Sequence, residues 1–242
     1  MSVVRPEPLT IRSAEDQVYE ALRDQIIHGL APLTPLRLNH LAASLAVSTM
    51  PVRVALRRLE SEGLVTTLPR RGSRVAPLRV EDIEEIQMMR SRIEGLAART
   101  GAPNVDEVGL AEMRRHLASL QKSIKSKDID GYVAHLRAFE DVCYQASGWP
   151  RLTRMVEDLR RSAERYLRIA VAGGGDSVLT SRFWERFYDA VEAKDGAAAE
   201  GALNEALMWT LEWIREYLTG SDQNPVPNAN KPQRVAKATT KQ

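Results

Sequence analysis

The first 80 residues show two different spacings of apolar positions. Apolar residues recur at steps of three and four over residues 13–28, again near residues 39–45, and from Ser48 to Gly63, which predicts three amphipathic helices. From residue 65 this helical spacing is lost. Val65–Leu68 and Ser73–Ala76 predict two short strands around an Arg-Arg-Gly turn, which together form a hairpin.

From residue 80 to residue 220 the apolar residues again have helical spacing, and no segment shows the pattern of a strand. Six apolar stripes follow one another, and the first of them is predicted to combine Ile83, Ile86, Met89, Ile93 and Leu96. Six amphipathic helices without intervening strands are expected to pack as an antiparallel bundle. The segment after Gly220 is polar and rich in proline, which predicts a disordered tail.

Pro51 lies near the start of the third predicted helix. Proline is tolerated in the first turn of a helix, where its missing N–H has no partner to lose, and Ser48 is a suitable N-cap residue. Pro51 therefore marks a helix start. A short helix, a tight turn, a second helix and a hairpin are the parts of a winged helix-turn-helix, whose second helix enters the DNA major groove.

The predicted fold is thus mainly α, with two domains in 242 residues. Residues 11–78 are predicted to form a winged helix-turn-helix with a small β-hairpin, and residues 79–220 a bundle of about six helices. Residues 1–10 and 221–242 are expected to be disordered. Residues 1–80 hold 11 Lys and Arg against 7 Asp and Glu, whereas residues 81–220 hold 19 against 24, so only the first domain is expected to meet a polyanion.

The third helix carries the candidate contacts to double-stranded DNA. Helical spacing puts Arg53, Arg57 and Arg58 along or beside the side opposite its apolar stripe. A run of charges often does no more than solvate a helix face. Arg70 and Arg71 add two cations at the tip of the predicted wing, which favours DNA binding.

The same residues resemble a known family. The stretch "LAASLAVSTMPVRVALRRLESEGLV" with "PRRGSRV", and more broadly residues 15–76, is similar to the DNA-binding domain of the GntR family of bacterial transcription regulators. Residues 80–218 resemble, more loosely, the effector-binding FCD domain of the FadR subfamily, as in "MMRSRIEGLAAR" and "AFEDVCYQASGWPRL". The resemblance implies a homodimeric repressor or activator that binds a palindromic operator and responds to a small metabolite.

The resemblance also assigns residues. It implies that Ser48, Arg53, Arg71 and Gly72 contact phosphate or base edges, with Arg53 reaching a guanine. Thr49 replaces the arginine usual in the family, and Ala46 stands where glycine is frequent, which costs strain if that residue is left-handed. The predicted DNA-binding set is Ser48, Thr49, Arg53, Arg57, Arg70, Arg71 and Gly72.

The helical domain departs from the family at its metal site. FCD domains usually bind a metal through an Asp or Asn and three His residues, and the corresponding positions here are Leu136, Glu140, Trp184 and Ala206. Only Glu140 offers a ligand atom. The sequence therefore predicts no metal and no other cofactor.

An aromatic group stands where the family has its ligand pocket. Either it lines a cavity for a larger, partly apolar effector, or it fills the core of a ligand-independent DNA-binding dimer. Arg90 similarly has two expected partners, a ligand carboxylate or Glu94 four residues on. The predicted effector-binding set is Arg90, Leu136, Glu140, Trp184 and Tyr188.

Other classes of protein are not favoured. The chain has no apolar run of the roughly 20 residues that a membrane span needs, and no signal peptide, so a cytoplasmic protein without a membrane partner is expected. The lone Cys143 excludes an internal disulfide. No carboxylate pair or phosphate-binding loop is recognisable, which predicts that the protein is not an enzyme.

Overall fold

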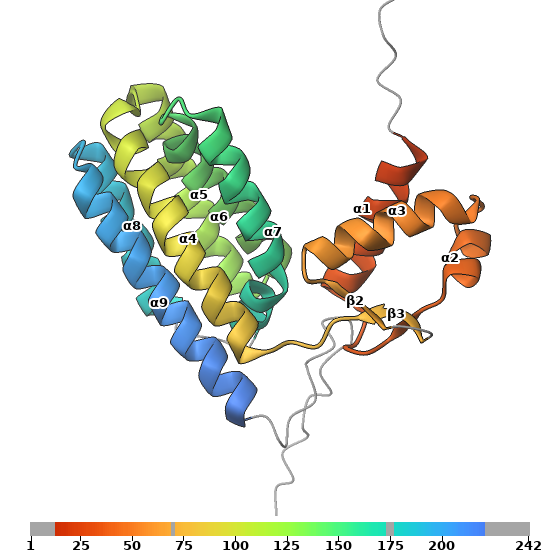
Figure 1. The fold of residues 1–242 in the computed structure, drawn as a ribbon. Helices are drawn as coiled ribbons and strands as arrows, with labels where there is room; N and C mark the ends of the chain where they lie inside the picture. Colours follow the sequence, from red (N-terminus) through yellow and green to blue (C-terminus); the bar gives the residue numbers. More distant parts are fainter. Residues whose placement is uncertain (1–12, 69–70, 173–176, 221–242) are drawn as a thin grey trace, which may run out of the picture. The chain divides into compact units, whose positions relative to one another are not determined.

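The computed structural model describes residues 13–68, 71–172 and 177–220, and the side chains of residues 177–181 are not described. The two segments predicted to be disordered, 1–10 and 221–242, lie outside the described residues. The chain divides into two compact units, one ending at Pro77 and the other beginning at Leu78 (Figure 1). Each unit is described by itself.

The first unit combines three helices with a small sheet. Its elements are α1 (Ala14–His28), β1 (Pro35–Leu36), α2 (Leu38–Ser44), α3 (Thr49–Ser61), β2 (Val65–Leu68) and β3 (Gly72–Val75). The strands are antiparallel in the order β1-β3-β2, and Pro35 of β1 pairs with Arg74 of β3. The predicted hairpin is confirmed. β1 was not predicted, because two residues are too few to show an alternating pattern.

Local chemistry explains where these helices begin. The Ser13 hydroxyl accepts a hydrogen bond from the Asp16 backbone N–H and so caps α1. Ser48 is the N-cap residue of α3 in an extended conformation, although its hydroxyl makes no capping bond, and Pro51 lies in the first turn as predicted. Ala46, in the turn before α3, has φ +52°, a left-handed conformation that costs strain for a residue with a Cβ.

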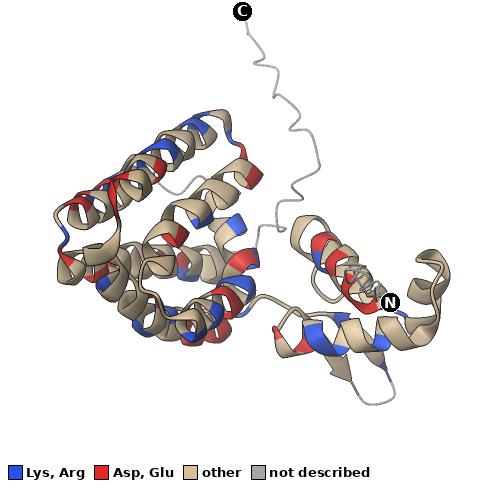
Figure 2. Cartoon of the chain, turned by 90° about the horizontal axis from the view of Figure 1, so that it is seen from above, with Lys and Arg blue, Asp and Glu red and all other residues tan. Residues whose placement is uncertain are grey.

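The second unit is the predicted helical bundle. It comprises α4 (Val80–Gly101), the short 3₁₀-helix η1 (Ala102–Asn104), α5 (Glu107–Ser126), α6 (Ile129–Gln145), α7 (Pro150–Ala172), α8 (Ser177–Glu192) and α9 (Gly196–Gly220). α4 packs against α9 and α7, α5 against α6, and α8 against α9. Figure 2 shows positive and negative residues interspersed along these helices. Among the described residues, no helix has the length and apolar character that crossing a membrane requires.

The orientation of α4 differs from the prediction. Ile83 is buried as expected, but Met89 and Leu96 are 41% and 37% exposed. The buried side of α4 instead includes Gln87, Arg90 and Glu94. Polar side chains occupy this face because each finds a hydrogen-bonding partner inside the bundle, so the apolar stripe alone gave the wrong rotation of the helix.

Two glycines let helices approach closely in the second unit. A Cβ on Gly101 would collide with the backbone carbonyl oxygen of Cys143 in α6, and a Cβ on Gly196 would collide with the carbonyl oxygen of Arg99. The end of α4 is therefore packed against the backbone of α6 and the start of α9 without an intervening side chain.

Candidate DNA-binding surface and effector site

Two arginines of α3 face away from the core of the first unit. Val52, Leu56 and Leu59 are buried, whereas Arg53 and Arg57 are exposed. Among the described residues, neither guanidinium makes an ion pair. This leaves both cations able to approach a phosphate or a base edge, and Ser48 and Thr49 are exposed at the start of the same helix.

Arg58 has a different environment. Its guanidinium lies 3.7 Å from the centre of the Tyr19 ring and forms ion pairs with Asp16 at 3.4 Å and Glu62 at 3.7 Å. Arg58 therefore ties α3 to α1, although its side chain is still 42% exposed. Sequence spacing placed it along or beside the side that carries Arg53 and Arg57, and unlike them it is engaged in ion pairs.

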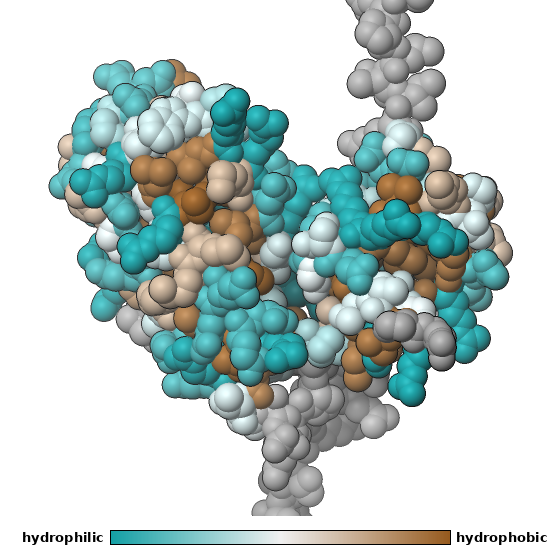
Figure 3. Space-filling model, viewed as in Figure 1, coloured by the Kyte–Doolittle hydropathy of each residue, from teal (hydrophilic) through white to brown (hydrophobic). Residues whose placement is uncertain are grey.

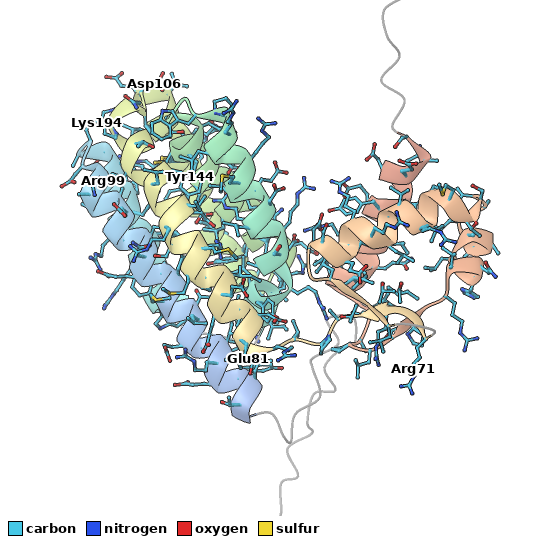
Figure 4. The ribbon with its side chains drawn as sticks, viewed as in Figure 1. Arg71, Glu81, Arg99, Asp106, Tyr144 and Lys194 are labelled. Carbon is cyan, nitrogen blue, oxygen red and sulfur yellow. The ribbon has the colours of Figure 1, made fainter. Side chains whose placement is uncertain are left out.

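The hairpin between β2 and β3 presents the wing. Gly72 has φ +75°, which a residue without a Cβ adopts at no steric cost. The Arg71 backbone N–H closes the turn by donating to the Leu68 carbonyl at 3.1 Å, and its side chain is exposed and projects from the hairpin (Figure 4). Arg70, also predicted to contact DNA, lies outside the described residues.

Met50 is a candidate contact that the sequence analysis missed. Its side chain is 64% exposed in the first turn of α3, next to Thr49. Exposed apolar atoms at this end of a recognition helix are suited to contact the methyl group of thymine. The sequence did contain a signal for this contact, because Met50 is an apolar residue that lies outside the apolar stripe of α3.

A buried cluster of charged groups lies inside the second unit. Glu94 of α4 accepts from Arg90 at 2.5 Å, from Arg160 of α7 at 3.4 Å and from the Tyr144 hydroxyl of α6 at 3.2 Å. Arg160 also pairs with Glu140 and, at 2.6 Å, with Asp141. Figure 4 places Tyr144 among the helices of this unit. We call this set the charged cluster: Arg90, Glu94, Glu140, Asp141, Tyr144 and Arg160.

The two buried carboxylates of the charged cluster have opposite pKa shifts. Burial opposes the charge of Glu94, but Arg90 and Arg160 outweigh it and lower the pKa of this carboxyl. For Glu140, burial dominates, the neighbouring Glu94 adds repulsion, and the pKa rises to about 7 despite Arg160. The Oε1 atom of Glu140 is buried and has no hydrogen-bond partner among the described residues, which fits the weaker stabilisation of its charge.

The predicted effector residues are all buried but do not form one group. Arg90 and Glu140 belong to the charged cluster, and of the two partners expected for Arg90, Glu94 is the one it contacts. Leu136, Trp184 and Tyr188 lie in the apolar core, where the Trp184 ring meets Phe139 edge-on. The Tyr188 hydroxyl also donates to Glu192 at 3.0 Å.

The residues of the second unit do not fit the metal site of the family. Leu136, Trp184 and Ala206 have no ligand atoms suited to the ion, and the one remaining candidate, Glu140, is paired with Arg160. No group of three or more potential ligands exists among the described residues. His116 and His135 approach each other, with 3.4 Å between their Nδ1 atoms, but belong to no such group.

The exposed arginines of α3, the wing and an all-helical second unit define a winged helix-turn-helix regulator. Residues 14–75 match the model of the bacterial regulatory proteins of the gntR family, and residues 85–208 match the FCD domain. The chain belongs to the GntR family of transcriptional regulators, and its FCD domain is consistent with the FadR subfamily.

Relatives extend this likeness over most of the chain. The HTH-type transcriptional repressor RspR of Escherichia coli is 26% identical, over 83% of this chain and 88% of that protein. The probable D-xylose utilization operon repressor of Paenarthrobacter nicotinovorans is 29% identical, over 81% and 86% of the two chains. The solved structure of E. coli McbR/YncC has a TM-score of 0.73 and 25% identity, and covers 86% of this chain and 100% of McbR.

Proposed function

We propose that this protein is a homodimeric repressor that binds a palindromic operator and is modulated by a small molecule held in its helical domain. The observation that carries the DNA-binding part is the exposed side of α3, where Arg53 and Arg57 make no ion pair among the described residues. Arg71 and Gly72 supply the wing, and Ser48 and Thr49 the first turn. The names of RspR and the D-xylose relative support repression over activation.

A second copy of the chain is the partner we propose for α4. Met88, Met89 and Leu96 are 54%, 41% and 37% exposed on this helix. Figure 3 shows apolar surface gathered on the visible face of the helical unit. A single winged helix covers too little DNA to select one site in a genome, so pairing through α4 would supply the second half-site contact.

We further propose that the effector acts on the charged cluster, through Arg90 and Glu140, while Leu136, Trp184 and Tyr188 form its packed surroundings. The proposed protein needs no cofactor, catalyses no reaction and works in the cytoplasm, where bacterial operators are. A second candidate function is a ligand-independent DNA-binding dimer. The burial of Leu136 and Trp184 in the apolar core favours it.

One experiment tests both candidates. Binding sites are selected from random duplex DNA with the full chain, with and without a pool of small metabolites. We expect selected sites with two-fold symmetry, and an occupancy that changes with one fraction of the pool. Asymmetric single half-sites bound by a monomer would contradict the dimer, and occupancy indifferent to every fraction would favour the ligand-independent protein.

A further inference from the structure

We propose that a small organic carboxylate binds in a cavity between α6 and α7, at the outer side of the charged cluster. This inference rests on the proposed effector function and names the site and the chemical class of the ligand. The cavity has a volume of about 380 Å³. Small-molecule sites typically measure roughly 300–1,000 Å³, so the space suits a compact metabolite.

The inner wall of this cavity is a buried cation. Arg160 is 7% exposed, and its guanidinium is held from inside by Glu94 and Glu140. From the cavity side it is held by Asp141, whose side chain is 46% exposed. A ligand carboxylate can replace Asp141 on Arg160 at little cost, because the displaced side chain is already half in water.

The remaining lining groups favour an anion over a cation. Arg154 is exposed, donates only to the Pro150 carbonyl at 3.4 Å, and makes no ion pair among the described residues. The side-chain amide of Gln145 has no hydrogen-bond partner in the described part of the chain. The lining acids are engaged, since Asp141 pairs with Arg160 and Glu157 with Arg161. The donors still available in this cavity therefore suit a carboxylate.

This site is distinct from the predicted effector set. The cavity is lined by Arg137, Asp141, Tyr144, Gln145, Arg154 and Arg160 among others, and by none of the five predicted residues. The ligand would reach Glu140 through Arg160, and Arg90 through Glu94, which both Arg160 and Tyr144 contact. Trp184 is then a packing residue, whereas Arg154 is a binding residue.

Thermal unfolding of the full chain tests the site. Succinate, glutarate and benzoate are each added at 10 mM, in parallel with their uncharged amides. We expect at least one acid to raise the Tm by 2 °C or more and its amide to leave the Tm unchanged. Arg154→Gln should weaken the Kd of that acid at least tenfold, measured by calorimetry.

A matched variant controls for charge and for folding. Arg151→Gln removes an exposed arginine from the first turn of the same helix, outside the cavity, and should bind the acid like the wild type. Failure of all three acids to stabilise the wild type would overturn the proposal, and so would equal binding by Arg154→Gln.

Operator affinity is measured separately. If a metabolite alters operator affinity equally in wild type and Arg154→Gln, the effector function stands and this site fails. If acids bind here without altering operator affinity, the site stands and the effector function fails.

Discussion

Arg53 and Arg58 lie five positions apart on α3, yet among the described residues Arg58 makes ion pairs and Arg53 makes none. Arg58 is fixed by the Tyr19 ring and by Asp16, which lies 42 residues earlier in the chain. Residue type and helical spacing were enough to predict exposure for Arg53. They could not predict the contacts of Arg58 with Tyr19 and Asp16, because these two residues belong to another helix.

Replacing Arg53 separates recognition from stability. Arg53→Ala is expected to weaken operator binding by about 1–3 kcal/mol, because a guanidinium that reads a base edge is lost, while the Tm stays unchanged. Fluorescence anisotropy with labelled operator measures the first effect. Arg58→Ala is the counterpart and should lower the Tm through loss of the contact with Tyr19. Equal DNA affinity of Arg53→Ala and wild type would refute the assignment.

The raised pKa of Glu140 predicts a pH dependence of stability. Its pKa is about 7 in the folded protein and near 4.5 ordinarily, so the folded state holds this proton more tightly than the unfolded state. The associated stabilisation is complete below pH 4.5 and is lost as the pH rises through 7. The ionisation of Glu140 should therefore lower the free energy of unfolding by about 1–3 kcal/mol as the pH rises from 5 to 8.

Urea titrations at several pH values measure this effect. Glu140→Gln cannot ionise and should show a flatter profile over the same range, whatever its absolute stability. An identical slope in the variant and the wild type would show that other groups cause the dependence.

Among the elements, α4 shows that sequence patterns can predict the position of a helix in the chain without predicting which side of it is buried. The spacing of apolar residues correctly predicted all six long helices of the second unit, because each helix buries apolar side chains in the bundle. The rotation of α4 was not predictable, since its buried Glu94 depends on Arg160, 66 residues later. Similarly, the DNA-binding helix was predictable from local signals, whereas the cavity between α6 and α7 depends on tertiary packing.

The close approach at the end of α4 gives a prediction for this element. Gly101→Ala is expected to destabilise the protein by about 1–3 kcal/mol, because the added methyl group meets the Cys143 carbonyl and forces the helices apart. Gly201→Ala in α9 is the matched control. An added Cβ there has nothing within 4 Å, and better helix propensity should stabilise the protein by roughly 0.5–1 kcal/mol. Chemical denaturation compares the two, and a gain of stability in Gly101→Ala would contradict the packing.

At the scale of the whole molecule, the proposed dimer depends on the outer side of α4. Leu96→Glu should weaken self-association, because a carboxylate would be buried without a partner at the interface. Val108→Glu is the control, because Val108 is 75% exposed on α5, outside the proposed interface. Sedimentation over a range of concentrations measures both, and a Leu96→Glu dimer as tight as the wild type would exclude this face.

Transmission from the helical unit toward the DNA-binding unit is expected to involve α7. The Tyr166 hydroxyl accepts from the Arg79 backbone N–H and donates to its carbonyl, both at 3.2 Å, just before α4 begins. Tyr166 shares α7 with Arg160, six residues away, which spans about 9 Å along a helix. A ligand that shifts α7 would therefore act on the first residues after Pro77.

Tyr166→Phe tests this route. The variant should retain its affinity for operator and for the effector separately, while the change in operator affinity caused by the effector becomes smaller. The measurement is the operator Kd with and without effector in both proteins. An undiminished response in Tyr166→Phe would remove α7 from the route.

The position of Arg160 has a consequence for how the regulator depends on the supply of metal ions in the cell. A regulator with an inorganic ion at its centre must acquire that ion after synthesis, so its activity follows the nutritional supply of the metal. Arg160 provides the interior positive charge as part of the polypeptide, paired with Glu94 and Glu140 as soon as the chain folds. Gene control by such a protein is expected to continue unchanged through metal starvation.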